Sequence, residues 1–144
     1  MTDAPLVDTN ILIHTYTEES RNKAKAMELI QKCFLGKLKL CVSLQNIGEF
    51  CSASIRKYGA NPEMTNSITQ ALLRSKNFAK LHYEASTFEK ALLLTEKYKM
   101  QFWDAMLAAT MMENNVSTIY TEDEIFGKIE GINAINPFNK NIKR

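Results

Sequence analysis

The chain has 144 residues, of which 45% are hydrophobic and 24% charged, and its net charge is +2. This composition is typical of a globular domain with its own core, and it lacks the strongly basic field that would by itself indicate nucleic-acid binding. No apolar run reaches the roughly 20 residues that a membrane-spanning helix needs, and the acidic start MTDAPL is unlike a signal peptide. We therefore expect one cytoplasmic domain over residues 1–144, without membrane association and with a short basic tail at about 139–144.

Strands and helices are predicted to alternate along the chain. The first element is a buried strand at Leu6 and Val7, which stops at Asp8 and turns into a helix at Thr9 and Asn10. Further helices are predicted at residues 21–35, 44–58, 62–76, 87–98 and 102–113, with a short helix within 121–126. Further strands are predicted at residues 38–42, 79–83, 117–120 and 132–135. This order favours an α/β fold in which helices flank a parallel sheet.

Apolar spacing also predicts which positions of each element face the core. In the strand at 38–42, Leu38, Leu40 and Val42 alternate with Lys39 and Cys41. The inward helix positions are Ala24, Met27, Ile30 and Phe34; Leu44, Ile47, Cys51, Ile55 and Tyr58; Ile68, Ala71 and Leu72; and Phe88, Ala91, Leu92 and Thr95. Helix ends are marked by Gly36, Gly59 and the Asn114–Asn115 pair, and Ser43 is suited to cap the helix that follows it.

The cysteines argue against a disulfide-stabilised domain and against a zinc site. Cys33, Cys41 and Cys51 are odd in number and form no CxxC pair, and only His14 and His82 are present to complete a metal site. No zinc pattern can be assembled from these residues. We expect free thiols in a reducing compartment.

Four acidic residues occupy positions from which they can reach one edge of the predicted sheet. Asp8 and Asp123 each follow a strand, Asp104 lies in the first turn of an apolar helix, and Glu49 lies in the helix after the second strand. Ligands of open α/β sheets bind at the carboxyl ends of the strands. Each acid also has a structural explanation, because the three aspartates suit helix starts and Glu49 suits a solvated helix face with Gln45, Ser52 and Arg56.

Convergence of these acids in one pocket is the more economical explanation. Carboxylates that share a pocket raise one another's pKa unless a cation balances their charge. Oxygen ligands without histidine or cysteine favour Mg²⁺ or Mn²⁺. Such ions activate water for attack on a phosphodiester or phosphoryl group.

Four motifs follow one another along the chain: VDTNIL at 7–12, NIGEF at 46–50, FWDAMLAAT at 102–110, and IYTED at 119–123 followed by INPF at 135–138. In this order they resemble the PIN domain, and within it the VapC-type toxin ribonucleases of toxin–antitoxin pairs. The resemblance covers nearly the whole chain, and its first and third motifs are the most specific. It implies a compact three-layer α/β/α fold with a central, mostly parallel sheet, and an endoribonuclease that depends on Mg²⁺ or Mn²⁺.

The resemblance also implies roles for individual residues, with an RNA phosphodiester hydrolysed by a metal-activated water. The catalytic acids matched by position are Asp8, Glu49, Asp104 and Asp123, of which the three aspartates are metal ligands. Asn10 and Thr121 match polar residues that orient the acids, and Glu122 or Glu124 is close enough to share or take the role of Asp123. The implied partners are the RNA substrate, a cognate antitoxin of a type II pair that covers the acidic groove, and a second copy in a homodimer.

Positive charge to hold RNA is scattered rather than clustered. The candidates are Lys37, Lys39, Arg56, Lys57, Arg74 and Lys76, together with Lys140, Lys143 and Arg144 in the tail, and ordinary solvated side chains are the alternative for each.

Other functions stay open at this point. VDTN also resembles a degenerate aspartyl phosphatase or phosphotransferase motif with Asp8 as nucleophile, but Asn10 replaces its second aspartate and no lysine stands in a supporting motif. A PIN domain that processes RNA without being a toxin, or that binds RNA without catalysis, is a further alternative.

Overall fold

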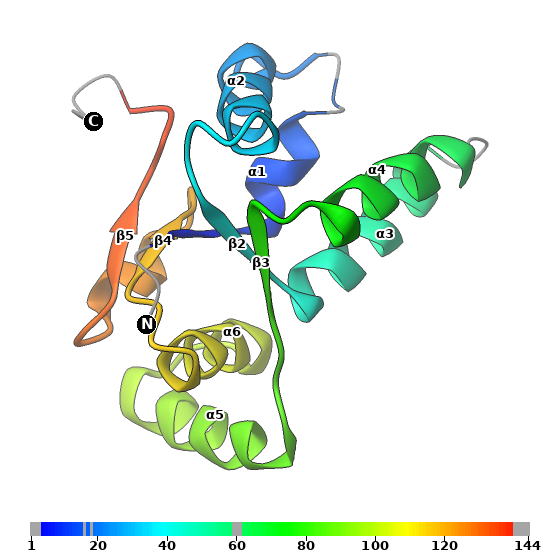
Figure 1. The fold of residues 1–144 in the computed structure, drawn as a ribbon. Coiled ribbons are helices and arrows are strands. Elements are labelled where there is room, and N and C mark those ends of the chain that lie inside the picture. The colour runs from blue at the N-terminus through cyan, green and yellow to red at the C-terminus, as the bar shows by residue number, and fades with distance from the viewer. Residues whose placement is uncertain (1–3, 16, 18, 59–61, 140–144) are drawn as a thin grey trace.

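The computed structural model describes residues 4–15, 17, 19–58 and 62–139. A five-stranded, all-parallel sheet runs through the centre in the order β3-β2-β1-β4-β5 (Figure 1). The strands are β1 (Leu6–Val7), β2 (Leu40–Ser43), β3 (Phe78–Leu81), β4 (Thr118–Tyr120) and β5 (Asn133–Ile135). The helices are α1 (Thr9–His14), α2 (Lys23–Phe34), α3 (Leu44–Tyr58), α4 (Pro62–Arg74), α5 (Ala85–Tyr98), α6 (Phe102–Glu113) and the 3₁₀ helix η1 (Glu124–Lys128).

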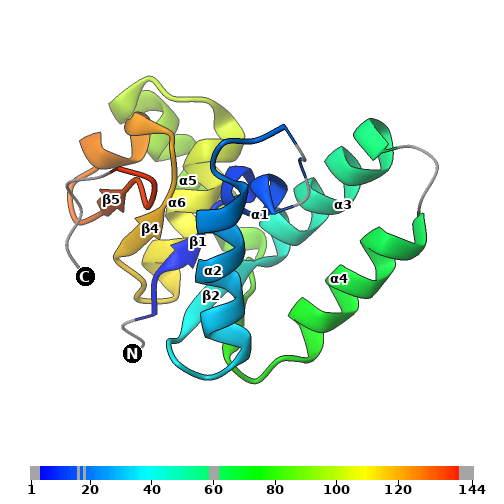
Figure 2. The same cartoon turned by 90° about the horizontal axis from the view of Figure 1, so that it is seen from above.

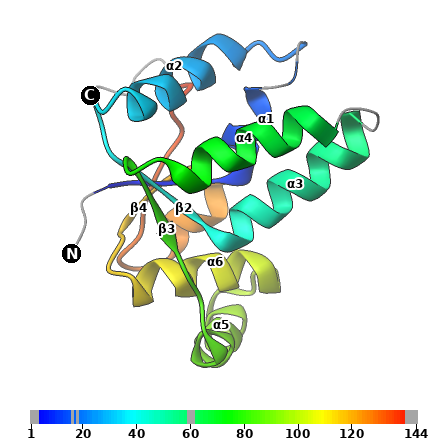
Figure 3. The ribbon, with the colours of Figure 1, turned by 45° about the vertical axis from the view of Figure 1, so that its right-hand side comes forward.

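Helices cover both faces of the sheet, which makes three layers. Helices α1 to α4 pack on one face, and α5 and α6 pack on the other, as the two views from different sides show (Figures 1 and 3). The α3–α4 hairpin extends to one side of the sheet (Figure 2). The predicted α/β/α fold with a central parallel sheet is therefore confirmed.

The side chains of the short central strands pack alternately into two separate cores, one on each face of the sheet. Val7 and Val42 pack in the core under α1 to α4, whereas Leu6 and Cys41 pack in the core under α5 and α6. All four side chains are completely buried. Cys41 is buried as fully as its neighbours Leu40 and Val42, because a parallel sheet covered on both sides has no solvent-facing side.

The inward faces of three helices also differ from the predicted stripes. In α2 the buried positions are Ala26, Leu29, Ile30 and Cys33, whereas Met27 and Phe34 are partly exposed. In α3 the buried apolar residues are Ile47 and Phe50, and Ile55 is 53% exposed. In α5 the buried residues are Thr87, Ala91 and Leu94, and Phe88 and Leu92 are exposed. Two overlapping stripes satisfy helical spacing in each helix, and packing against the sheet selects which of them is buried.

Several helix boundaries follow the predicted signals. Helix α2 ends before Gly36, which has φ +78° and whose neighbour Lys37 donates its backbone N–H to Lys32 O at 2.8 Å. Ser43 caps α3, because its Oγ accepts the backbone N–H of Asn46 at 2.9 Å. The predicted stop at Gly59 and the basic tail from residue 140 lie outside the described residues.

Two further sequence predictions concern the state of the cysteines and membrane-spanning helices. Cys33, Cys41 and Cys51 are all free of disulfide bonds. No helix in the described part of the chain is both long and apolar enough to cross a membrane.

Candidate active site

Asp8 lies between β1 and α1, at the carboxyl edge of the sheet. Its backbone is extended, with φ −71° and ψ 157°, and its Oδ1 accepts the backbone N–H of Thr9 at 2.7 Å. Its Oδ2 accepts a hydrogen bond from Thr121 Oγ1 at 2.7 Å, which ties the end of β1 to the end of β4. The residue therefore caps α1 and also turns its carboxylate toward the residues after β4.

Burial raises the pKa of Asp8 to about 6. The hydrogen bonds from Thr121 and from the backbone of Thr9 oppose this shift, and the negative charges of Glu49 and Asp104 add to it. The Asp8 carboxyl is therefore hydrogen-bonded and still difficult to ionise, chiefly because it is buried. Positive charge in its vicinity would hold it in the ionised form.

The other three predicted acids reach the same place from three different elements. Glu49 projects from α3, and its Oε1 accepts a hydrogen bond from Thr9 Oγ1 at 2.8 Å. Asp104 lies half-buried in the first turn of α6, where burial first and then the charges of Asp123 and Glu49 raise its pKa. Asp123 follows β4 and caps η1, with its Oδ1 accepting the backbone N–H of Ile125 at 3.0 Å.

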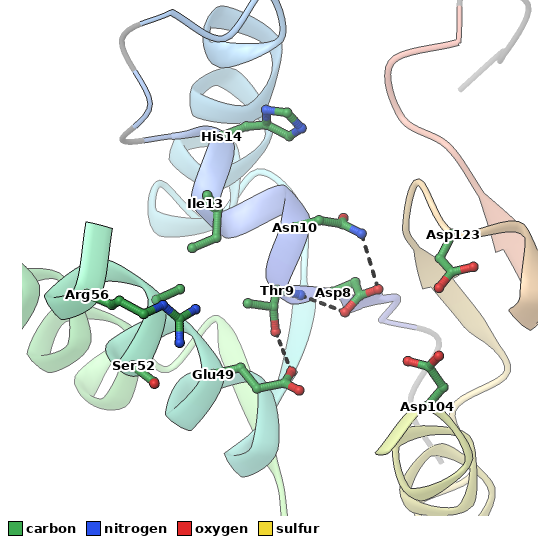
Figure 4. Close-up of a pocket in the computed structure, with 11 residues that line it drawn as sticks. Asp8, Thr9, Asn10, Ile13, His14, Glu49, Ser52, Arg56, Asp104 and Asp123 are labelled. Atoms are coloured by element: carbon green, nitrogen blue, oxygen red, sulfur yellow. Dashed lines mark hydrogen bonds between the residues drawn. The ribbon is translucent and has the colours of Figure 1, made fainter. Parts of the chain in front are cut away.

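These four acids line one open cleft of about 620 Å³. Figure 4 shows the carboxylates of Asp8, Asp104 and Asp123 turned toward one another, with Glu49 facing them from α3. The remaining lining residues are Thr9, Asn10, Ile13, His14, Ser52, Ala53 and Arg56. The sheet edge thus gathers all four predicted acids, although 115 residues separate Asp8 from Asp123 along the sequence.

The residues predicted to support the acids also lie at the site. Thr121 is buried, with its hydroxyl donating to Asp8 and accepting the backbone N–H of Asp123 at 2.9 Å, so that one side chain orders two of the acids. Asn10 Nδ2 lies 3.5 Å from Asp8 Oδ2, the outer limit of a hydrogen bond. Asn10 Oδ1 is buried without a partner among the described residues.

Asn46 is a supporting residue that the sequence did not single out. It is completely buried in the first turn of α3, where its Nδ2 donates to Thr9 Oγ1 at 3.0 Å and approaches Asp8 Oδ1 at 3.4 Å. Its Oδ1 accepts a hydrogen bond from Ser43 Oγ at 2.8 Å. The available signal was its position three residues before Glu49, which places both side chains on neighbouring parts of one helix face.

His14 is the second residue that sequence reasoning missed. Its Nε2 lies 2.6 Å from Glu122 Oε1, its Nδ1 lies 2.5 Å from Ser20 Oγ, and its ring packs edge-on against Phe138. Glu122 is thereby held at the rim by a histidine. Of the three neighbouring acids, it is Asp123 that lines the cleft, whereas Glu122 and Glu124 are absent from its lining residues.

The side chains of the cleft are chemically suited to a hard divalent cation. Its donors are carboxylate, amide and hydroxyl oxygens, and the unpartnered Asn10 Oδ1 calls for a donor such as ordered water. No group of three or more His, Cys, Asp and Glu side chains in the described ranges forms a ready-made metal site. Such ions are commonly held by one or two carboxylates, with water and substrate phosphate completing the coordination.

Comparison with known protein families decides the assignment of this fold and cleft. The PIN domain family matches residues 6–132, which is most of the chain. The chain belongs to the PIN domain family. Comparison with curated protein sequences gives no significant match.

Several solved structures share the fold of this PIN domain. A toxin–antitoxin complex from Klebsiella pneumoniae has 22% sequence identity and a TM-score of 0.67, covering 94% of this chain and 98% of that chain. VapC20 of Mycobacterium tuberculosis, a sarcin–ricin loop cleaving toxin, has 20% identity and a TM-score of 0.65, covering 83% and 90%. DNA-bound VapBC from Salmonella typhimurium has 15% identity and a TM-score of 0.66, covering 93% and 98%. At these identities the likeness establishes the fold.

Proposed function

We propose that this PIN domain is an endoribonuclease that depends on Mg²⁺ or Mn²⁺ and acts as the toxin of a type II toxin–antitoxin pair. The observation that carries the proposal is the convergence of Asp8, Glu49, Asp104 and Asp123 on one open cleft at the carboxyl edge of the sheet. Membership of the PIN family and the fold shared with VapC-type toxins support it. The acids lie on four different elements, so a purely structural role would require four separate explanations.

Asp8, Asp104 and Asp123 are the residues that would hold the ion. A bound divalent ion would lower the pKa of a water and neutralise charge that builds on the phosphate. Thr121 fixes the orientation of Asp8 through its 2.7 Å hydrogen bond, and Thr9 fixes Glu49 through its 2.8 Å hydrogen bond. Because these hydrogen bonds already hold the carboxylates in place, the charges of the site need little reorganisation during the reaction.

Glu49 has a different part from the three aspartates. Its side chain is exposed, and its Oε1 is bonded to Thr9 on the side of α1. Its Oε2 lies 3.5 Å from Gln45 Nε2, so it retains capacity to accept a hydrogen bond from water in the cleft. In the proposed reaction, Glu49 orients this water toward the phosphodiester.

The phosphatase alternative requires a nucleophilic Asp8 with a supporting lysine. Both oxygens of Asp8 are already hydrogen-bonded, and the basic side chains among the described lining residues are those of His14 and Arg56. These observations favour hydrolysis by an activated water over a covalent intermediate.

Cleavage of structured RNA by the purified chain tests the activity. We expect cleavage in Mn²⁺, none in EDTA, and a loss of at least about 100-fold in Asp8→Asn and Asp104→Asn. The matched control is Glu96→Gln, which removes an exposed carboxylate of α5 that is not among the lining residues of the cleft and should cleave as the wild type does. Equal cleavage by wild type and Asp8→Asn would place the active site elsewhere. RNA binding without cleavage by the wild type would favour a silent RNA-binding module.

The proposed partners are tested separately. We propose that a small antitoxin covers the acidic cleft and that the chain forms a homodimer. Co-expression with the product of any short reading frame beside its gene should give a complex in which RNA cleavage is blocked. A chain that cleaves RNA but does not inhibit cell growth when expressed, and whose gene has no short reading frame beside it, would indicate an RNA-processing PIN domain instead.

A further inference from the structure

Arg56 brings positive charge into a cleft that is otherwise acidic. It projects from the last turns of α3 and lines the cleft together with the four acids. Figure 4 shows its guanidinium beside Ser52, on the far side of Glu49 from Asp104 and Asp123. The cleft therefore has an anionic end at the sheet edge and a cationic end along α3.

The guanidinium is not used to neutralise the acids. No carboxylate of a described residue lies within ion-pair distance of Arg56, although Glu49 lies on the same helix and lines the same cleft. Its side chain is exposed, so burial of a stabilising ion pair does not explain its position. An arginine that has no anionic partner among the described residues and lies beside an open cleft is available to bind an anion from solution.

The spacing along α3 suits two phosphates that lie one or two nucleotides apart on the same strand. Glu49 and Arg56 are seven residues apart, which is two helical turns or about 10 Å along the axis. A phosphodiester cut among the carboxylates would therefore leave a neighbouring phosphate of the same strand within reach of Arg56. Arginine binds phosphate in bidentate geometry, which fixes the direction of the strand as well as adding affinity.

We propose that Arg56 binds an RNA phosphate one or two nucleotides from the one that is cut and so orients the strand across the acidic cleft. The proposal rests on the proposed ribonuclease function and extends it by naming the residue that positions the substrate. Arg56 was one of nine scattered basic candidates in the sequence, and among those whose side chains the structure describes it is the one that lines the cleft with the acids. A carboxylate of a protein partner is the competing occupant.

The salt dependence of RNA binding tests the contact without requiring catalysis. Binding of a fluorescein-labelled single-stranded RNA to Arg56→Gln, measured by anisotropy in Ca²⁺, should weaken by about 5- to 50-fold, and the slope of log K against log salt should fall by about 1. Arg56→Lys should keep the slope while binding less tightly. Lys97→Gln removes one charge from the last turn of α5, on the other face of the sheet, and should match the wild type.

A chemical change in the RNA locates the phosphate. Once the cut site is mapped, single neutral methylphosphonates are placed at each phosphate around it, and wild type and Arg56→Gln are compared. We expect the effect of Arg56→Gln to disappear for a neutral group at one phosphate beside the cut, and to persist for all others. Equal salt slopes and equal KM values for wild type and Arg56→Gln, with cleavage intact, would overturn this proposal alone. Unchanged RNA binding with weakened antitoxin binding would assign Arg56 to the protein partner, and absence of both RNA binding and cleavage in the wild type would instead overturn the proposed function.

Discussion

Thr121 Oγ1 donates a 2.7 Å hydrogen bond to Asp8 Oδ2 across 113 residues of sequence. The same oxygen accepts the backbone N–H of Asp123, so this hydroxyl links two of the acids at adjacent strand ends. Thr121→Val keeps the shape of the side chain and removes both contacts. We expect RNA cleavage to fall by about 10- to 100-fold, as is usual for residues that orient metal ligands. Cleavage rates and urea unfolding of Thr121→Val should be measured beside Thr121→Ser, which keeps the hydroxyl and should retain most of the activity.

The raised pKa of Asp8 predicts that this residue lowers the free energy of unfolding at neutral pH. Its pKa is about 6 in the folded chain against 3.8 for the free side chain. Between these values the folded state holds a proton that the unfolded state has lost, so the stability contributed by Asp8 falls as pH rises from about 4 to about 6 and then stays level.

Asp8→Asn should therefore stabilise the chain in EDTA. The full shift corresponds to about 3 kcal/mol, and we expect a gain of about 1 to 2 kcal/mol at pH 7.5, because the amide loses one hydrogen-bond acceptor. The gain should vanish near pH 4, where the Asp8 carboxyl is protonated in the folded state. Urea unfolding at both pH values measures it. An Asp8→Asn chain that is less stable than wild type at both pH values would contradict the raised pKa.

Divalent ions should stabilise the wild type by binding among the acids. A ligand that binds only the folded state adds about 2.7 kcal/mol to the free energy of unfolding at 100 times its dissociation constant. We expect a rise in Tm with Mn²⁺ that EDTA reverses, and a much smaller rise in Asp104→Asn and Asp123→Asn. The Glu96→Gln control should respond as the wild type does. An equal rise in all four chains would place the ion outside the cleft.

Asn46 should matter to both stability and activity. Asn46→Ala leaves Ser43 Oγ and Thr9 Oγ1 without their buried partner, which we expect to cost about 1 to 3 kcal/mol in the free energy of unfolding. Loss of the amide also loosens Thr9, the residue that holds Glu49, so cleavage should fall as well. Asn66→Ala, at an exposed position of α4, is the matched control and should change neither property.

The amino-acid sequence by itself determined where the acids enter the fold. Asp8 and Asp123 follow short apolar strands, and Asp104 opens an apolar helix, so local pattern and capping preference were enough to place each at an element boundary. Alternation of strands and helices then fixed a parallel sheet, and parallel strands bring their carboxyl ends to one edge. The common position of the three aspartates follows from these local rules.

Tertiary structure decided what depends on the rotation of each helix and on contacts between distant segments. Helical spacing fits both the Met27–Phe34 stripe and the Ala26–Cys33 stripe of α2, and only packing against the sheet selects the second. The roles of Asn46 and His14 arise from contacts with α1 and with the turn after β4, which no local pattern contains. Asp8 therefore has two functions that the sequence offered as alternatives: it caps α1 locally, and the fold surrounds it with the other acids.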